Sequence, residues 1–103
     1  MRVSAEKLRE IAKKIKGNET AAQRQRMMAA LRLGGVTTVD GFRHLEIIRP
    51  AVVVQQLRDS GENIVTLRIS DETEQGIKHN VGLYVLEPKD GYELKTPDLS
   101  EQG

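Results

Sequence analysis

The 103-residue sequence contains no cysteine and no tryptophan, and it has only one phenylalanine and two tyrosines. Without cysteine, disulfides, iron–sulfur clusters, thiolate zinc sites and cysteine nucleophiles are all excluded. Because aromatic residues are scarce, the core must consist of Leu, Ile, Val and Ala. A chain of this length buries only about two-thirds of the surface that it exposes when unfolded. These limits favour one small domain with little room for a deep substrate pocket.

The sequence also has no long apolar run. No stretch approaches the roughly 20 apolar residues needed to span a bilayer, and a charged helical pattern follows the first residues in place of a secretory signal. We therefore expect a cytoplasmic protein without a membrane partner. His44 and His79 are far apart, and no metal, nucleotide or nucleophile motif is present. We expect no enzyme activity, no metal and no cofactor.

The net charge of +1 hides a strong asymmetry along the chain. Residues 1–58 contain twelve Lys or Arg and five Asp or Glu, whereas residues 59–103 contain four and ten, so the parts carry +7 and −6 and sum to +1. This separation suggests a basic face and an acidic end. The alternative is that charges cluster by chance on solvated surfaces.

Helical periodicity predicts two helices before residue 36. The first spans residues 4–16 with Ser4 as its cap, and its apolar stripe either packs on the domain or forms a dimer contact. That stripe consists of Leu8, Ile11, Ala12 and Ile15. The second begins at Thr20, where Thr20 and Gln23 form a capping-box pattern, and Gly34-Gly35 ends it. Its buried residues are Met27, Met28, Ala30 and Leu31, and its outward residues are Gln23, Arg24 and Arg26.

Two further helices are predicted before residue 61. A short one begins at its cap, Thr38, and turns Phe42 toward the core. The next spans residues 49–59, because Pro50 suits the first helical position. Its predicted buried row is Ile47, Ala51, Val54 and Leu57. Val52 and Val53 then lie on the outer surface, where they contact a thymine methyl group or a partner protein; alternatively the helix phase is wrong by one position and Val53 is core.

After Gly61 the pattern changes from helical to alternating. Residues 64–69 and 81–86 predict two strands of a hairpin, joined by the polar stretch 70–80. Lys78 and His79 are the basic residues of that stretch, among Asp71, Glu72 and Glu74. The chain is thus predicted to comprise a basic helix at 1–18, a domain at 19–88 and a flexible polar tail at 89–103.

The order of these elements predicts an α+β fold of the winged helix-turn-helix type: a three-helix core, a two-stranded wing and an additional N-terminal helix. Residues 20–70 resemble a family of small winged helix-turn-helix proteins that is common in phage and prophage reading frames. The most specific part is Arg49-Pro50-Ala51, followed by Leu57-Arg58 and Gly61. The remaining matching residues are Gln23-Arg24, Gly35, Thr37-Thr38, Asp40, Leu45, Ile47, Val54, Ile64 and Thr66. Glu46 stands where the family often has Gly, and Val53 where it tends to have Arg.

The fold and the resemblance imply sequence-specific binding of double-stranded DNA by a small transcriptional regulator or phage accessory factor. Helix 49–59 is expected in the major groove, and a homodimer is expected because paired half-sites require one. Arginine suits guanine, glutamine suits adenine and valine suits the thymine methyl group, while threonine hydroxyls donate to phosphates. The predicted DNA-binding residues are Arg24, Arg26, Thr37, Thr38, Arg43, Arg49, Val52, Gln55, Gln56 and Lys78.

The alternative is a protein-interaction module on a winged-helix scaffold, an adaptor or inhibitor of a host protein. The acidic wing and tail favour it, as does Val53 in place of a cation. The two functions differ in where the basic residues lie. DNA binding requires one face shared with helix 49–59 by Lys13, Lys14, Arg24, Arg26, Arg43 and Arg49. A partner protein requires an exposed apolar patch around Val52 and Val53.

Overall fold

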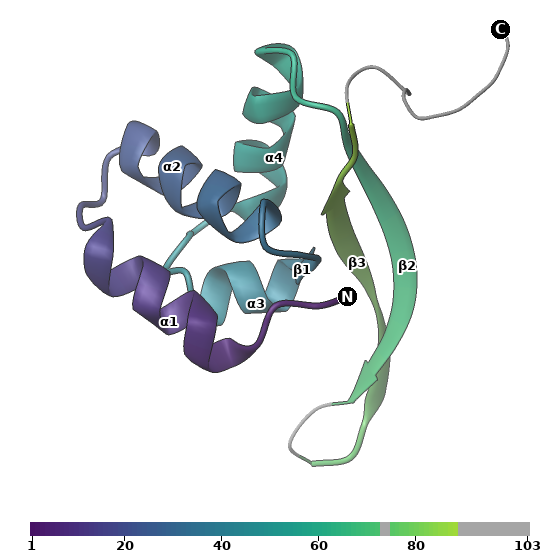
Figure 1. The fold of residues 1–103 in the computed structure, drawn as a ribbon. Coiled ribbons are helices and arrows are strands. Elements are labelled where there is room, and N and C mark those ends of the chain that lie inside the picture. The colour runs from purple at the N-terminus through teal and green to yellow at the C-terminus, as the bar shows by residue number, and fades with distance from the viewer. Residues whose placement is uncertain (73–74, 89–103) are drawn as a thin grey trace, which may run out of the picture.

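The computed structural model describes residues 1–72 and 75–88 (Figure 1). Four helices are followed by a long hairpin, in the order predicted from the sequence. The elements are α1 (Ala5–Lys14), α2 (Thr20–Leu31), β1 (Val36–Thr37), α3 (Thr38–Arg43), α4 (Pro50–Asp59), β2 (Ile64–Glu72) and β3 (Lys78–Leu86). The sheet order is β1-β3-β2 with antiparallel pairing. The α+β winged helix-turn-helix architecture is confirmed. Within the described ranges no helix is long and apolar enough to cross a membrane.

The core lies between the helices and the inner face of the sheet. Its fully buried aliphatic side chains come from every helix or the turn beside it: Leu8, Met27, Val36, Leu45, Ile47 and Val54. Each contributes about 1.5–3 kcal/mol by leaving water. Leu8 and Ile11 belong to this cluster, so the apolar stripe of α1 packs on the domain and is not a dimer contact. The predicted domain boundary at residue 18 stays a prediction, and the predicted tail lies outside the described residues.

The ends of α1 and α2 differ in part from the predictions. Ser4 caps α1 as predicted, since its Oγ accepts the Lys7 N–H at 3.2 Å. The helix ends at Lys14 because Ile15 is extended. The predicted capping box at Thr20 is wrong: Glu19 is the N-cap, without a side-chain hydrogen bond. The Gln23 amide donates instead to the Asn18 carbonyl at 2.8 Å.

Two predictions for α3 are wrong. The cap is Thr37, not Thr38, and its hydroxyl accepts the Asp40 N–H at 2.9 Å. Phe42 is 60% exposed, because this six-residue helix turns Asp40 and Gly41 inward. Phe42 therefore adds nothing to the core.

The phase of α4 also differs from the predicted one. Its buried residues are Pro50, Val53, Val54 and Leu57, which have the i, i+3, i+4, i+7 spacing of a core-facing helix. Val53 is only 3% exposed. Of the two predictions for this residue, the one that places it in the core is therefore confirmed. Ala51 is exposed. Its burial was predicted from a spacing of four residues after Ile47, but Ile47 lies in the turn before the helix, so that spacing does not place the two on one helix face. The core thus explains a valine where the resembling family tends to have arginine.

The wing is longer than predicted and its loop is shorter. β2 and β3 have nine residues each, and Ser70–Glu72 pair with Lys78–Asn80. The hairpin extends beyond the helices (Figure 1). β1 pairs Val36 with Tyr84; it was not predicted, because a two-residue strand is too short to show alternation.

The two faces of the hairpin differ in burial. Residues of one face, among them Ile64 and Tyr84, are buried toward the helices. The opposite face is apolar over three cross-strand pairs, Val65–Val85, Leu67–Leu83 and Ile69–Val81, and then ends in the polar pair Asp71–His79. Leu67 is half exposed and the other five aliphatic residues are partly buried. The outer face of the wing is therefore aliphatic over residues 65–69 and 81–85 and polar nearer its tip.

Candidate nucleic-acid interface

The helix-turn-helix unit is formed by α3, the turn at 44–49 and α4. Gly41 permits the close approach of these helices, since a Cβ atom there would lie 3.3 Å from the Pro50 ring and 3.4 Å from Met27 Cε. Even an alanine would require these neighbours to shift by a few tenths of an ångström. The angle at which α4 leaves the domain therefore depends on this glycine.

The turn contains Glu46 in the left-handed conformation, with φ of 57°. Leu45 and Ile47 on either side are fully buried, so the chain must reverse between two anchored side chains. This conformation costs a non-glycine residue on the order of 1 kcal/mol. The left-handed conformation explains why the family that this chain resembles often has glycine at this position. In this chain the position is occupied by Glu46, so the turn keeps the conformational strain.

The outer face of α4 presents Arg49, Val52 and Gln55, spaced three residues apart. Arg49 and Gln55 are exposed and Val52 is 45% exposed. Arg49 is the N-cap residue, and its side chain makes no capping hydrogen bond. One helix stripe thus carries a cation, a methyl-bearing residue and an amide, the three groups that suit base edges in a major groove.

The two glutamines of α4 have different surroundings. Gln56 is half-buried, and its Oε1 accepts Arg24 Nη1 at 3.3 Å. Gln55 points to solvent, where its Nε2 donates to Asp59 Oδ1 at 3.1 Å. The Gln56 contact brings Arg24 from α2 to the side of α4. Gln55 is the more accessible of the two predicted adenine-reading residues.

A hollow of about 230 Å³ lies between the first turns of α2 and α4. Three of the predicted DNA-binding residues, Arg49, Val52 and Gln56, lie together here. The other lining residues are not in the predicted DNA-binding set. The full lining is Thr20, Gln23, Ile48, Arg49, Val52, Val53 and Gln56. Ile48 is 69% exposed, so the rim of this hollow is partly apolar.

Arg26 is buried, which contradicts its predicted outward position and its role in docking DNA. Only 2% of the residue is exposed. Its guanidinium donates four hydrogen bonds to main-chain carbonyl oxygens: Leu45 at 2.7 Å, Ile15 at 2.8 Å, Gly17 at 2.8 Å and Glu46 at 3.2 Å. The spacing signalled this burial, since Arg26 stands midway between buried Ala22 and Ala30 on one helix face.

The two threonines are also less accessible than predicted. Thr37 is fully buried and its hydroxyl is occupied by the cap of α3, so the structure contradicts a phosphate contact from this side chain. Thr38 is half-buried, and its Oγ1 donates to the Tyr84 hydroxyl at 3.3 Å. These residues fix α3 against the sheet.

In the wing, Lys78 lies in β3 and not in a loop. It is exposed and stands opposite Glu72, while His79 stands opposite Asp71. Lys78 and His79 therefore each face an acidic residue on the neighbouring strand. The wing contributes less positive charge to a DNA surface than the helices do.

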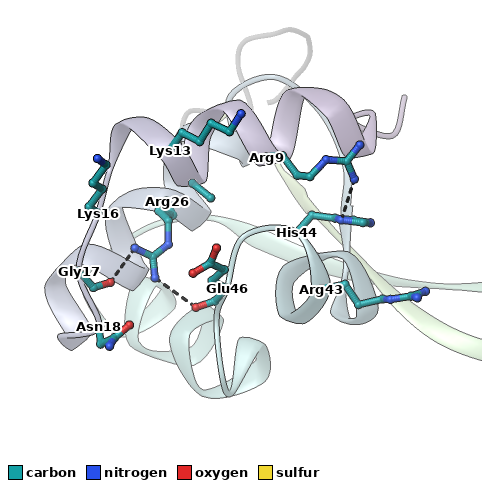
Figure 2. Close-up of a pocket in the computed structure, with 10 residues that line it drawn as sticks. Arg9, Lys13, Lys16, Gly17, Asn18, Arg26, Arg43, His44 and Glu46 are labelled. Carbon is teal, nitrogen blue, oxygen red and sulfur yellow. Dashed lines mark hydrogen bonds between the residues drawn. The ribbon is translucent and has the colours of Figure 1, made fainter.

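A second hollow, of about 360 Å³, separates α1 from α3 and the turn (Figure 2). Six of its lining residues are Lys, Arg or Glu, and a seventh is histidine: Arg9, Lys13, Lys16, Arg26, Arg43, Glu46 and His44. The structure thus brings Lys13 and Arg43 together at this hollow. At the hollow beside α4 it brings together Arg49 and Gln56, the residue that binds Arg24. Lys14 lines neither. Lys13 was among the basic residues that sequence reasoning required for DNA binding, but Arg9 and Lys16 were not considered as candidates.

The amino terminus is fixed by an ion-pair cluster that no local sequence pattern predicts. Arg2 Nε pairs with Asp40 Oδ2 of α3 at 2.9 Å, and Arg2 Nη2 pairs with Asp71 Oδ2 of β2 at 3.0 Å. The hydrogen bond to Asp40 chiefly raises the pKa of Arg2. The hydrogen bond from Arg2 lowers the pKa of Asp71 below its usual value. This cluster joins the first residues to both the helix-turn-helix unit and the wing.

A three-helix core with a helix-turn-helix and a β-hairpin behind the last helix defines a winged-helix domain of the type that binds DNA. A sequence model described as the winged helix-turn-helix domain matches residues 22–89. This is more than half of the chain, and the chain belongs to that family. No match was found among curated proteins or among solved structures. Helix α1 precedes the matched region.

Proposed function

We propose that this chain binds double-stranded DNA sequence-specifically, with α4 in the major groove, as a small transcriptional regulator or a phage DNA-binding accessory factor. The observation that carries the proposal is the outer stripe of α4, where Arg49, Val52 and Gln55 stand together on a helix-turn-helix unit. Arg24, held beside α4 by Gln56, and Arg43 of α3 supply phosphate contacts. Lys78 reaches the backbone from the wing.

The test is selection of bound duplexes from a random-sequence library, followed by affinity measurements on the selected site. A bidentate arginine–guanine contact contributes about 1–3 kcal/mol of discrimination. Arg49→Ala is therefore expected to relax the preference at one base pair. The matched control is Arg32→Ala, which removes an exposed arginine from the far end of α2. Failure to enrich any sequence, or equal effects of the two variants, would overturn the proposal.

The predicted homodimer is part of this proposal. Since the stripe of α1 is buried, the aliphatic outer face of the wing is the surface that suits a second copy. Leu67 lies at its middle, between Val65 and Ile69, and opposite Leu83. Sedimentation equilibrium should show a dimer that Leu67→Lys converts to a monomer. A wild-type chain that remains monomeric at high concentration and on DNA would contradict this.

The alternative, a protein-interaction module, is favoured by one observation. Ile48 is 69% exposed and Val52 is 45% exposed at the hollow between α2 and α4, which gives α4 an apolar rim. If no duplex binds, Ile48→Ser becomes the informative variant in a search for a protein partner. Thymine methyl groups can contact the same apolar rim, so duplex binding is tested before a partner protein is sought.

A further inference from the structure

We propose that the cleft between α1 and the helix-turn-helix turn is a second phosphate-binding site, which holds the DNA backbone beside the segment read by α4. This inference rests on the proposed function. It assigns a role to α1, which lies outside the family match at residues 22–89.

One wall of the cleft is a basic face of α1. Arg9 and Lys13 lie four residues apart on one face of α1, and Lys16 lines the same cleft from the segment just after the helix. All three are exposed. In the part of the chain that the structure describes, none of the three forms a salt bridge. Figure 2 shows these side chains along the rim of the cleft.

The opposite wall is formed by Arg43 and His44 from the end of α3. Arg9 Nη1 lies 3.3 Å from His44 Nδ1, so basic side chains from the two walls meet directly (Figure 2). Because arginine has donors only, the histidine nitrogen is the acceptor in this contact. The two walls therefore converge on one narrow site rather than diverging into solvent.

The floor of the cleft is the buried guanidinium of Arg26. Its four partners are carbonyl oxygens, which orient the charge but carry no net charge to cancel it. Five Lys or Arg and one Glu line the cleft, which gives a formal charge of +4. Such a concave positive surface attracts a phosphate group more strongly than isolated surface lysines do.

The cleft continues into the hollow beside α4. Gln23 lies between them: its Nε2 donates to the Asn18 carbonyl at 2.8 Å, and its Oε1 accepts the Ile48 N–H at 3.3 Å. Asn18 lines the cleft, and Ile48 lines the hollow with Arg49. A phosphodiester strand that passes the amino end of α4 can therefore run on into the cleft, where the acidic residues beside its path are Glu46 and Glu19, whose carboxylate lies next to Gly17.

The experiment uses the full chain and compares two double variants that remove equal positive charge. Lys13→Gln with Lys16→Gln empties one wall of the cleft. Lys7→Gln with Arg32→Gln is the matched control, since both residues are exposed and line neither hollow. Duplex binding is followed by fluorescence anisotropy at several salt concentrations. Each lost phosphate contact lowers the log–log salt slope by about 0.9.

The inference predicts a slope reduced by about 2 in the cleft variant and an unchanged slope in the control. Equal slopes in both variants overturn the inference, while the proposed function stands if Arg49→Ala still relaxes base preference. Absence of wild-type binding overturns both. Inorganic phosphate is titrated separately and followed by amide NMR at residues 43–46. Suppose that phosphate binds there saturably but the cleft variant binds DNA with an unchanged salt slope. That result would overturn the assignment of the cleft to the DNA backbone and would identify it as a site for free phosphate.

Discussion

The guanidinium of Arg26 donates its Nε–H to the main-chain carbonyl of Leu45 at 2.7 Å, inside the domain. The same group holds the carbonyls of Ile15 and Gly17 at the end of α1. One buried charge thus connects α2, the end of α1 and the helix-turn-helix turn. It also satisfies carbonyl groups that a helix end otherwise leaves without partners.

Arg26→Ala is expected to lower the free energy of unfolding by about 3 kcal/mol, because it leaves buried carbonyl groups unpaired. Arg26→Lys should recover only part of this, since an ammonium group does not reproduce the planar fork. Urea unfolding measures both. Arg32→Ala is the control and should stay within about 0.5 kcal/mol of wild type. If Arg26→Ala is as stable as wild type but binds DNA more weakly, Arg26 is an exposed DNA-contacting residue and its buried structural role is wrong.

Glu46→Gly is expected to stabilise the domain by up to about 1 kcal/mol, because glycine adopts the left-handed conformation of this turn without strain. Glu46→Ala removes the carboxylate but keeps the strain, so it separates charge from conformation. Thermal unfolding of the three proteins gives the order. If alanine stabilises as much as glycine, the effect comes from the carboxylate and the conformational account is wrong.

The stability of the chain should depend on pH through Asp71. Arg2 lowers the pKa of this carboxyl in the folded state, whereas its unfolded value is about 3.9. Ionised Asp71 therefore stabilises the fold above pH of about 4, and this contribution is lost as the pH falls toward the lower, folded pKa. The contribution is at most about 1 kcal/mol, because the pair is solvent-exposed.

Urea unfolding of wild type and Asp71→Asn measures this dependence. The two proteins should differ at neutral pH and converge in acid, whereas Glu72→Gln should show a smaller difference at every pH. A difference between wild type and Asp71→Asn that persists unchanged below pH of about 2 would show that the pairing with Arg2 is not its source.

Gln55 and Gln56 should contribute differently to DNA binding. Gln55→Ala removes an exposed amide from the outer stripe of α4 and should weaken binding to the selected site by about 1–3 kcal/mol. Gln56→Ala should weaken binding to specific and unrelated duplexes by similar factors, because it releases Arg24 from the side of α4. Affinities for both duplex types distinguish the two patterns. The reverse assignment would show that Gln56 turns outward on DNA.

Local signals in the sequence were sufficient for the order of elements, the Ser4 cap and the start of α4 at Pro50. They failed where burial depends on distant groups. The spacing of Arg26 with Ala22 and Ala30 fits a buried helix face, but an arginine can be buried there only because carbonyls from two other segments converge on it, and helix periodicity does not report such partners. Val53 was misplaced because Ile47, a turn residue, was counted in the helical period. The basic cleft arises only when α1 packs beside the turn, which no spacing within either segment reveals.

The central claim, that this fold binds duplex DNA through the side of α4 and its neighbouring cations, is tested most directly by salt-dependent binding. A labelled random duplex is titrated by fluorescence anisotropy at about 50 mM and about 200 mM salt. Four or five phosphate contacts predict a log–log slope of roughly −4 and a loss of affinity of a few hundred-fold over that range. Absence of binding at the lower salt concentration would contradict the account.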